Sequence, residues 1–318
     1  MALFLSESDV KRLLTVAMAL EGVESAHRDL ALGQAMDTPR ARSRLPQTVL
    51  HILQGALPAQ GVIGYKAYTT NRSGNRFLVH LFDAASGRLR AVIEADYMGM
   101  IRTGAASGLA AKWLARPDST VAGIFGAGWQ AEGHVRAICA ALPLERVKVF
   151  SRKADKLQAF CQRMSEVTGV AVVPAESAEE TVRGSDLLGT VTTATQALFE
   201  ADWLEEGVHI NAAGSNALIR QELSEAAVKR CDLITVDAVP TALAEAGDLL
   251  SLLEKGRLHS RQLVELGDVI IGRHAGRSSA GQITLFESQG MAIQDLAVGL
   301  RVLAAAEAAG LGQEIPVQ

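Results

Sequence analysis

One short segment limits what this chain can fold into more than any other. Residues 121–125 form an apolar run, VAGIF, that predicts a buried parallel strand, and a glycine-rich turn into a helix follows at once. In this G-x-G-x-x-A pattern the first glycine permits a tight turn, the second lets the backbone approach a pyrophosphate, and the small last residue lets helix and strand pack closely. The turn residues are Gly126, Ala127, Gly128, Trp129, Gln130 and Ala131.

The helix that begins at this turn presents N–H groups and the positive end of its dipole, and both attract phosphate. We therefore predict a dinucleotide-binding site. A glycine-rich turn that binds nothing would carry the same pattern, so the prediction depends on the strand before the turn and the helix after it.

Residues 118–289 alternate between strands and helices. This alternation, with the glycine-rich turn after its first strand, predicts an α/β fold, a Rossmann-type doubly wound parallel sheet that forms a dinucleotide-binding domain. The expected strands are 121–125, 147–150, 170–173, 186–192, 208–213 and 232–237, and the expected helices are 129–141, 153–167, 177–183, 221–230 and 240–255.

Residues 1–117 have a different pattern, which predicts an α+β domain with a mainly antiparallel sheet. Helical spacing of apolar residues indicates one helix over 8–35, capped by Ser6 or Ser8, and another over 96–115. Residues 36–47 look like a polar connection. The alanine-rich run 290–309 predicts a helix that packs back on this domain, because the parallel sheet already looks complete, so we assign 290–318 to it. The expected strands are 49–53, 62–68, 77–82 and 89–94.

The composition excludes several classes of protein. Hydrophobic residues make up 48% and charged residues 21% of the 318 residues, as expected for a packed core. The net charge is −4 with acids and bases interspersed, which argues against a nucleic-acid surface or a polybasic membrane patch. The three cysteines, Cys139, Cys161 and Cys231, are scattered, which predicts free thiols in the cytoplasm. We expect no membrane span, no signal peptide and no metal site.

The end of the second expected strand indicates which nucleotide binds. Enzymes that use NAD usually place a carboxylate there for the ribose 2′-OH, whereas this chain has Ser151, Arg152 and, one turn later, Lys156. A 2′-phosphate would accept a forked contact from the arginine and a point charge from the lysine. This pattern favours NADP(H) over NAD(H), and a solvated basic loop is the alternative.

Several motifs outside the turn resemble those of the ornithine cyclodeaminase/μ-crystallin family. They are GYKAYT around Lys66, MIRTGAASG around Arg102, NAAGSN at 211–216 and the late run GRSSAGQITLFESQGMAIQDLA, and they occur in the family's order and spacing. The family includes ornithine and lysine cyclodeaminases, an archaeal type of alanine dehydrogenase, ketimine reductases and reductases of cyclic imino acids. The resemblance implies a homodimer built through the N-terminal sheet, with the active site between that substrate-binding domain and the nucleotide domain.

The resemblance also implies roles for individual residues. Such enzymes hold the substrate's carboxylate, which arginine grips in a bidentate way and lysine pairs as a point charge or proton source. The matching positions are Lys66, Arg102 and one arginine of 40–44, of which Arg42 fits best while Arg40 and Arg44 stay open. Asp295 would orient Lys66 or cap a helix. Further cofactor contacts are expected at Thr103, Thr192, Gly214 and Ser215, and His80 is a lesser candidate for a proton donor.

Asn216 is a further expected substrate-binding residue, at a position where the cyclodeaminases carry an aspartate. An amide neither acts as a general base nor pairs with an ammonium group as a carboxylate does, although this residue could simply form a turn. We therefore predict a reductase that uses NAD(P)H to convert an α-imino acid to an L-amino acid, with possible reversal as an amino acid dehydrogenase. The alternatives are a redox-neutral cyclodeaminase and a μ-crystallin-type protein that binds NADPH and a small ligand.

Overall fold

The computed structural model describes residues 2–215 and 217–316. It divides into two compact units. The first unit contains the chain up to Arg102 and from Gly290 onward, and the second unit is Thr103–Gln289. Each unit contains its own sheet.

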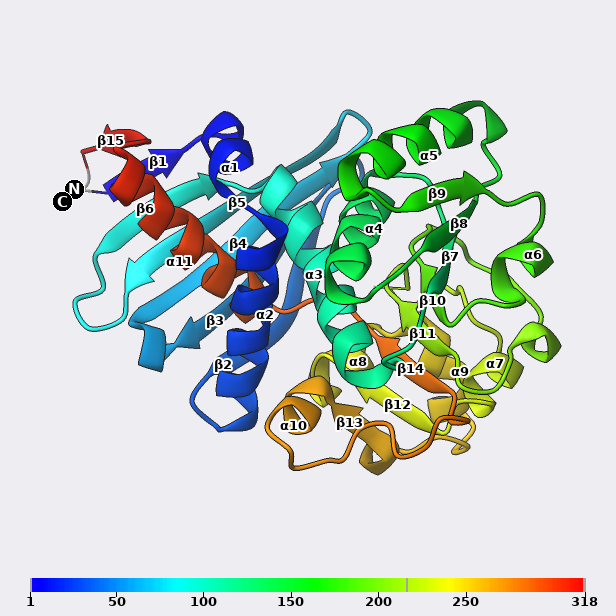
Figure 1. Cartoon of the computed structure of the whole chain (residues 1–318). Coiled ribbons are helices and arrows are strands. Elements are labelled where there is room, and N and C mark those ends of the chain that lie inside the picture. Colours follow the sequence, from blue (N-terminus) through cyan, green and yellow to red (C-terminus); the bar gives the residue numbers. More distant parts are fainter. Residues whose placement is uncertain (1, 216, 317–318) are drawn as a thin grey trace. The chain divides into compact units, whose positions relative to one another are not determined.

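The second unit is built on an eight-stranded sheet in the order β13-β12-β14-β11-β10-β7-β8-β9, in which every pairing is parallel. This arrangement confirms the predicted doubly wound parallel fold (Figure 1). Its elements are β7 (Val121–Phe125), α4 (Trp129–Ala141), β8 (Arg146–Phe150), α5 (Ala154–Thr168), β9 (Ala171–Pro174), α6 (Ala178–Val182), β10 (Leu187–Thr190), η2 (Ala201–Trp203), β11 (His209–Ala212), α7 (Glu225–Lys229), β12 (Leu233–Val236), α8 (Val239–Glu245), α9 (Gly247–Glu254), η3 (Ser260–Gln262), β13 (Leu263–Glu265), α10 (Leu266–Ile270) and β14 (Thr284–Glu287).

Strand β14 is the main element of this sheet that the sequence analysis missed. It lies in the interior of the sheet, where it pairs with both β11 and β12, so the sheet was not complete without it. A second difference is that the helix predicted over 240–255 is two helices, which meet at Ala246. Both differences arise where pairing or packing with distant residues, rather than local pattern, sets the element.

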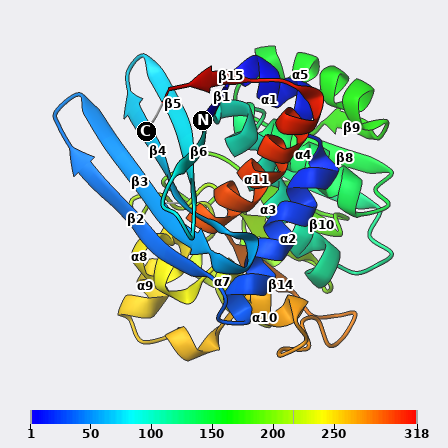
Figure 2. The same ribbon diagram turned by 90° about the vertical axis from the view of Figure 1, so that its left-hand side faces the viewer.

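The first unit contains a seven-stranded sheet in the order β15-β1-β6-β5-β4-β3-β2, antiparallel except for the β1–β6 pair. Helices α2 and α11 lie along one face of this sheet (Figures 1 and 2). Its elements are β1 (Ala2–Leu5), α1 (Glu7–Leu13), α2 (Val16–Ala31), β2 (Met36–Arg44), β3 (Thr48–Leu57), η1 (Pro58–Gln60), β4 (Val62–Asn71), β5 (Gly74–Asp83), β6 (Leu89–Glu94), α11 (Ala292–Ala309) and β15 (Gln313–Ile315).

Two predictions about the first unit were wrong. The segment predicted as a polar connection is largely strand β2, which forms the edge of the sheet and therefore tolerates polar side chains. The single helix predicted near the N-terminus is two helices, because Thr15 caps α2 by accepting a hydrogen bond from the Met18 N–H over 3.2 Å. Ser6 caps α1 with a capping box, one of the two caps considered.

Helix α3 (Asp96–Leu114) crosses the division between the units, which lies at Arg102/Thr103 rather than at the predicted 117/118. Within the second unit the small residues of α3 face α4. A Cβ at Gly104 would overlap the Gly133 carbonyl, and one at Gly108 would come within 2.8 Å of the Ala137 oxygen. The glycines therefore allow close helix packing, which joins this part of α3 to the second unit.

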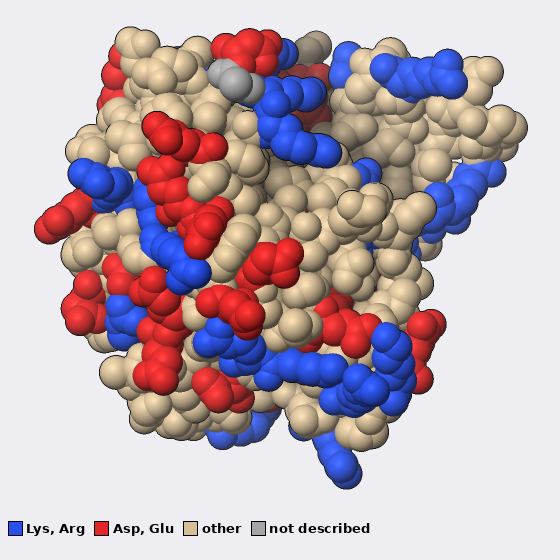
Figure 3. Space-filling model, turned by 90° about the vertical axis from the view of Figure 1, so that its right-hand side faces the viewer, with Lys and Arg blue, Asp and Glu red and all other residues tan. Residues whose placement is uncertain are grey.

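No helix among the described residues is long and apolar enough to cross a membrane. Acidic and basic side chains intermingle on the face of the molecule shown in Figure 3. Within residues 2–215 and 217–316, no group of three or more His, Cys, Asp or Glu side chains is arranged to hold a metal ion.

Candidate functional site

Two cations of the first unit share one buried carboxylate. Lys66 on β4 donates from Nζ to Asp295 Oδ1 over 3.1 Å, and Arg102 on α3 donates from Nε to the same oxygen over 2.9 Å. Asp295 is 0% exposed, Lys66 3% and Arg102 6%. With Lys66 protonated, one carboxylate balances only one of the two cations, so the cluster has an excess positive charge that a substrate carboxylate can neutralise.

Asp295 lies in the first turn of α11 and contacts Lys66, which is one of the two roles considered from the sequence. Its second oxygen, Oδ2, is buried and has no hydrogen-bond partner among the described residues. Buried polar atoms are nearly always paired, so an unpartnered carboxylate oxygen beside two cations suggests that a donor group from a ligand or water belongs there.

The environment of Lys66 lowers its pKa to about 8. Burial is the largest cause, the neighbouring Arg102 adds to it, and Asp295 opposes both by favouring the charged form. The Nζ atom also lies 5.1 Å from the centre of the Phe77 ring and 5.9 Å from that of Tyr68. A lysine with a pKa near neutrality is suited to give up and regain a proton.

Gln294 also holds Arg102, and no sequence motif predicted this role. Its Oε1 accepts from Arg102 Nη1 over 3.0 Å and from the Met291 N–H over 3.2 Å. The sequence offered one indication of this role, because Gln294 directly precedes Asp295 in the first turn of α11. Gly290 gives the guanidinium room, since a Cβ there would come within 2.7 Å of Nη1.

Two arginines of β2, Arg40 and Arg42, lie close to the sheet face on which the Lys66 side chain points. Arg42 pairs in register with His51, and the His51 ring stacks on Tyr68 at 4.2 Å. The Arg40 guanidinium lies 6.0 Å from the Tyr68 ring, and its charge is among the causes that lower the pKa of Lys66. Burial, together with the charges of Arg40, Arg42 and Arg44, lowers the pKa of His51 to about 4, so the histidine is neutral near pH 7.

His80 lies on the opposite face of the sheet from Lys66. It pairs with Tyr65, which precedes Lys66 on β4, and successive side chains of a strand point to opposite faces. The His80 ring stacks on Tyr65 at 4.5 Å. This position argues against the lesser proposal that it donates a proton beside Lys66.

The glycine-rich turn of the second unit has the geometry that a pyrophosphate needs. Gly126 has φ +117°, and a Cβ there would come within 2.7 Å of the Val191 oxygen. A Cβ at Gly128, in contrast, would meet nothing within 4 Å, so the space beside this backbone is open for a ligand. Gly128 is also the N-cap of α4 and offers no capping side chain to the first N–H groups. The residues therefore fit a dinucleotide.

The basic segment after β8 is accessible to a ligand. Arg152 and Lys156 are exposed, and the Ser151 Oγ accepts from the Lys153 N–H over 3.3 Å. Of the other expected cofactor residues, Thr192 and Gly214 follow the carboxyl ends of β10 and β11, and their N–H groups donate to one carboxylate, that of Glu222. Glu222 is a further residue that the sequence analysis missed.

Three expected site residues remain. Ser215 and Thr103, expected at the cofactor, lie in the second unit. Ser215 is buried and its hydroxyl donates to the Glu287 carboxylate. Thr103 is the first residue of the second unit and is partly buried within α3. Asn216 lies outside the described residues, so the structure does not bear on its role.

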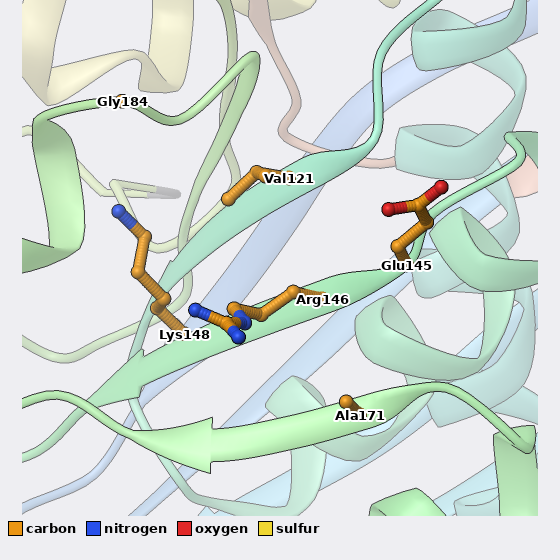
Figure 4. Close-up of a pocket in the computed structure, with 6 residues that line it drawn as sticks. All are labelled: Val121, Glu145, Arg146, Lys148, Ala171 and Gly184. Atoms are coloured by element: carbon orange, nitrogen blue, oxygen red, sulfur yellow. The ribbon is translucent and has the colours of Figure 1, made fainter.

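A hollow of about 390 Å³ lies elsewhere in the second unit. Figure 4 shows the side chains of Arg146 and Lys148, from β8, beside Val121 of β7. Lys148 donates to the carbonyl oxygens of Glu180 over 2.7 Å and Arg183 over 2.6 Å. Val121 and Arg146 are the first residues of their strands, whereas open α/β sheets bind ligands beyond the carboxyl ends. We therefore do not assign this hollow to the cofactor.

The sequence of this chain is similar to those of known proteins of one family. The profile of the ornithine cyclodeaminase/mu-crystallin family matches residues 1–309. A Δ1-pyrroline-2-carboxylate reductase of Bacillus cereus is 36% identical over 239 residues, which cover 75% of this chain and 73% of that protein.

Two solved structures are similar over nearly the whole chain. Δ1-Pyrroline-2-carboxylate reductase of Thermococcus litoralis, in complex with NADH and L-proline, has 29% identity and a TM-score of 0.94, covering 98% of this chain and 100% of that one. A dimeric archaeal alanine dehydrogenase with bound NAD has 32% identity and a TM-score of 0.93, covering 99% of each chain. The chain therefore belongs to the ornithine cyclodeaminase/mu-crystallin family.

Proposed function

We propose that the protein is a nicotinamide-dependent reductase that converts an α-imino acid to an L-amino acid. The observation that carries the proposal is the buried cluster of Lys66, Arg102 and Asp295, whose excess positive charge suits a small carboxylate. The glycine-rich turn supports a nicotinamide nucleotide as the reductant. Because two of the similar proteins are Δ1-pyrroline-2-carboxylate reductases, a cyclic imino acid is the first substrate class to test.

The nucleotide, when bound, supplies a hydride to the imine carbon, and residues 126–130 would hold its pyrophosphate. Arg102 pairs with the substrate carboxylate and orients the C=N bond. Reduction also requires one proton on the imine nitrogen, and Lys66 holds a proton that its lowered pKa makes transferable. Asp295 fixes the Nζ atom of Lys66 and keeps the lysine protonated near pH 7.

The third cation of the substrate site is one of the β2 arginines. The electrostatic influence of Arg40 on Lys66, together with its position over Tyr68, favours Arg40 as the partner of the carboxylate. Arg42, the better fit from the sequence, stays a candidate because it lies in the same row of side chains as His51 and Tyr68.

A panel of substrates tests the proposed reaction. Cyclic imines, and 2-oxo acids with ammonia or methylamine, should give oxidation of NADPH or NADH with formation of the L-amino acid. Ornithine with NAD⁺ should give little or no proline and ammonia, because residue 216 is an amide where the cyclodeaminases use a carboxylate. Robust proline formation would instead favour the cyclodeaminase alternative, and binding of NADPH without turnover of any imino acid would favour the μ-crystallin-type alternative.

We also propose that NADP(H) is preferred over NAD(H), because Ser151, Arg152 and Lys156 replace the usual carboxylate. Arg152→Asp should then raise the KM for NADPH far more than that for NADH. Loss of one charge-assisted contact is on the order of 1.5–3 kcal/mol, or roughly 10- to 150-fold. Steady-state kinetics with both nucleotides measures this, with Arg261→Asp as a control at another exposed cation. Equal effects on NADPH and NADH would contradict the assignment.

A homodimer through the first unit's sheet is proposed as well. The sheet face opposite Lys66 carries exposed apolar side chains on three adjacent strands. They are Leu50, Ile63 and Leu78, which are 37%, 48% and 37% exposed. An apolar sheet face of this kind is typical of a subunit interface. Ile63→Asp should convert a dimer to a monomer in light scattering, whereas Val167→Asp, at an exposed apolar residue of α5, should not. A dimer that survives Ile63→Asp at micromolar concentration would argue for another interface.

The cytoplasm is the proposed location. Cys139, Cys161 and Cys231 are free thiols, and burial raises the pKa of Cys231 to about 12. Unpaired, unreactive cysteines are typical of proteins in reducing compartments.

A further inference from the structure

In the second unit, the Glu222 carboxylate joins two loops that follow neighbouring strands. Its Oε1 accepts from both the N–H and the hydroxyl of Thr192, each over 2.6 Å, in the loop after β10. Its Oε2 accepts from the Gly214 N–H over 2.8 Å, in the loop after β11. Glu222 is 0% exposed, so these protein donors, rather than bulk water, satisfy the carboxylate. Each oxygen therefore holds one loop.

These loops lie at the edge of the sheet where the glycine-rich turn lies. Strands β7, β10 and β11 are adjacent and parallel, so the segments after them emerge at the same edge. A Cβ at Gly126 would come within 2.7 Å of the Val191 oxygen and 3.6 Å of Thr192 Cγ2, which shows that the turn and the loop after β10 are in contact. The chain order of the strands also reverses between β7 and β10, and doubly wound sheets bind nucleotides at such a point.

Glu222 is itself held in place by a second carboxylate. Asp248 Oδ1 accepts from the backbone N–H of Glu222 over 2.6 Å and from that of Leu223 over 2.9 Å. Gly214 approaches so closely that a Cβ there would overlap the Glu222 carboxylate. A side chain at this position would displace the Glu222 carboxylate, so glycine lets the loop after β11 approach it this closely.

We propose that Glu222 is a positioning residue for nicotinamide nucleotide binding, which it supports by tying the loop of Gly214 to the loop of Thr192, which contacts the glycine-rich turn. The inference rests on the proposed function. An ionised carboxylate accepts strongly at both oxygens, whereas a side-chain amide accepts at one end and donates at the other. A glutamine would turn its NH₂ group toward the donors of either Thr192 or Gly214, and that loop would lose its anchor.

The protonation state of Glu222 gives the proposal a second readout. Burial raises the pKa of this carboxyl to about 6, the hydrogen bonds from Thr192 oppose the rise, and Asp248 adds to it. As the pH falls through about 6, Glu222 gains a proton, and the protonated oxygen becomes a donor and a weaker acceptor for the backbone N–H that faces it. Two buried carboxyls in the same region titrate as well: the pKa of Asp248 is raised to about 6 and that of Glu287 well above its usual value, both mainly by burial.

The test compares Glu222→Gln with Asp186→Asn. Asp186 makes the same kind of contact at the amino ends of the strands, away from the glycine-rich turn. It accepts from the N–H groups of Thr120 over 2.8 Å and Val121 over 2.9 Å. We expect Glu222→Gln to raise the dissociation constant and KM of the nucleotide by about 10-fold or more. The KM of the imino acid at saturating nucleotide should change by less than about 2-fold. Asp186→Asn should lower the melting temperature without changing the KM of the nucleotide.

A second measurement tests the proposal on the wild-type protein. The affinity for NAD⁺ is measured by calorimetric titration between pH 7 and 5. NAD⁺ is used because the 2′-phosphate of NADPH titrates in this range. The affinity should fall as the pH falls through about 6, and the fall should be clearly smaller in a folded Glu222→Gln variant, in which Asp248 and Glu287 still titrate. Wild-type affinity that does not change with pH, or a folded variant that binds nucleotide normally, overturns the role of Glu222. A wild-type protein that binds no nicotinamide nucleotide at pH 7 overturns the proposed function too.

Discussion

Arg102→Leu is expected to lower kcat/KM for an accepted imino acid by about 10² or more. Arg102 is buried, and its guanidinium is held by Asp295 and Gln294 on the Nε and Nη1 sides. A leucine cannot pair with the substrate carboxylate, and misplacement of the reacting atoms alone can cost a factor of this size. Initial rates with the best imino acid from the substrate panel measure the effect. Arg301→Leu is the matched control, because Arg301 lies on α11 and donates to the backbone carbonyls of Ala297 and Glu21.

Adding Lys66→Met to Arg102→Leu should cost much less than the product of the two single effects. Both cations bind the same oxygen of Asp295, and groups that act as one unit are strongly non-additive. Nucleotide binding, measured by fluorescence titration, should survive both changes, because the turn that would hold the nucleotide is in the second unit. An Arg102→Leu enzyme with near-normal kcat/KM for every accepted imino acid would contradict the assignment and favour the binding-protein alternative.

Asp295→Asn is expected to have the second large effect, on both stability and the pH dependence of the reaction. The substitution leaves Lys66 and Arg102 buried without their shared carboxylate, and removing one partner of a buried ion pair typically costs about 3–5 kcal/mol. Denaturant titration measures this loss. Asp83→Asn is the control, because Asp83, at the end of β5 in the same unit, is only half-buried and accepts hydrogen bonds from the Ser86 N–H and hydroxyl.

The direction of the pH effect follows from the causes that act on Lys66. Its pKa is about 8, and Asp295 raises that pKa whereas burial and Arg102 lower it. If protonated Lys66 donates the proton, wild-type kcat/KM for reduction should fall as the pH rises through about 8. Without Asp295 the pKa of Lys66 falls further, so the loss should begin at lower pH. A profile from pH 6 to 9 whose basic limb does not move in Asp295→Asn would contradict the role of Lys66.

Much of the second unit was predictable from local sequence. The apolar run of β7, the glycines after it and the helix α4 are encoded within one short stretch, and the structure has both elements at the predicted bounds. Strand β14 was not predictable in this way. It is short, lies far along the chain, and pairs with β11 and β12 only because the tertiary fold brings it between them.

The candidate site divides in the same manner. Lys66, Arg102 and Asp295 could be named from motifs, because each lies in a recognisable stretch of sequence. Lys66 and Arg102 bind the same oxygen of Asp295 because folding brings together β4, α3 and α11, which are far apart in the chain. The contact of Gln294 with Arg102 depends on the same packing. The β2 arginines show the limit most clearly. Arg40, Arg42 and Arg44 lie in one polar segment, and the register of β2 shifts between Thr38 and Ala41, so the direction of each side chain depends on an irregularity that the local pattern does not encode.

Local sequence was thus enough to predict the parallel fold, the nucleotide turn and the residue types that suit an imino acid, because strand and helix periodicity and turn glycines act over a few residues. Which side chains meet could be seen only in the folded chain. Glu222 is the clearest case: nothing in its local sequence marks it, yet burial and the joining of two loops make it a structural anchor beside the turn. The reason is physical, since hydrogen bonds and pKa shifts depend on distances and burial that are set only when distant segments pack together.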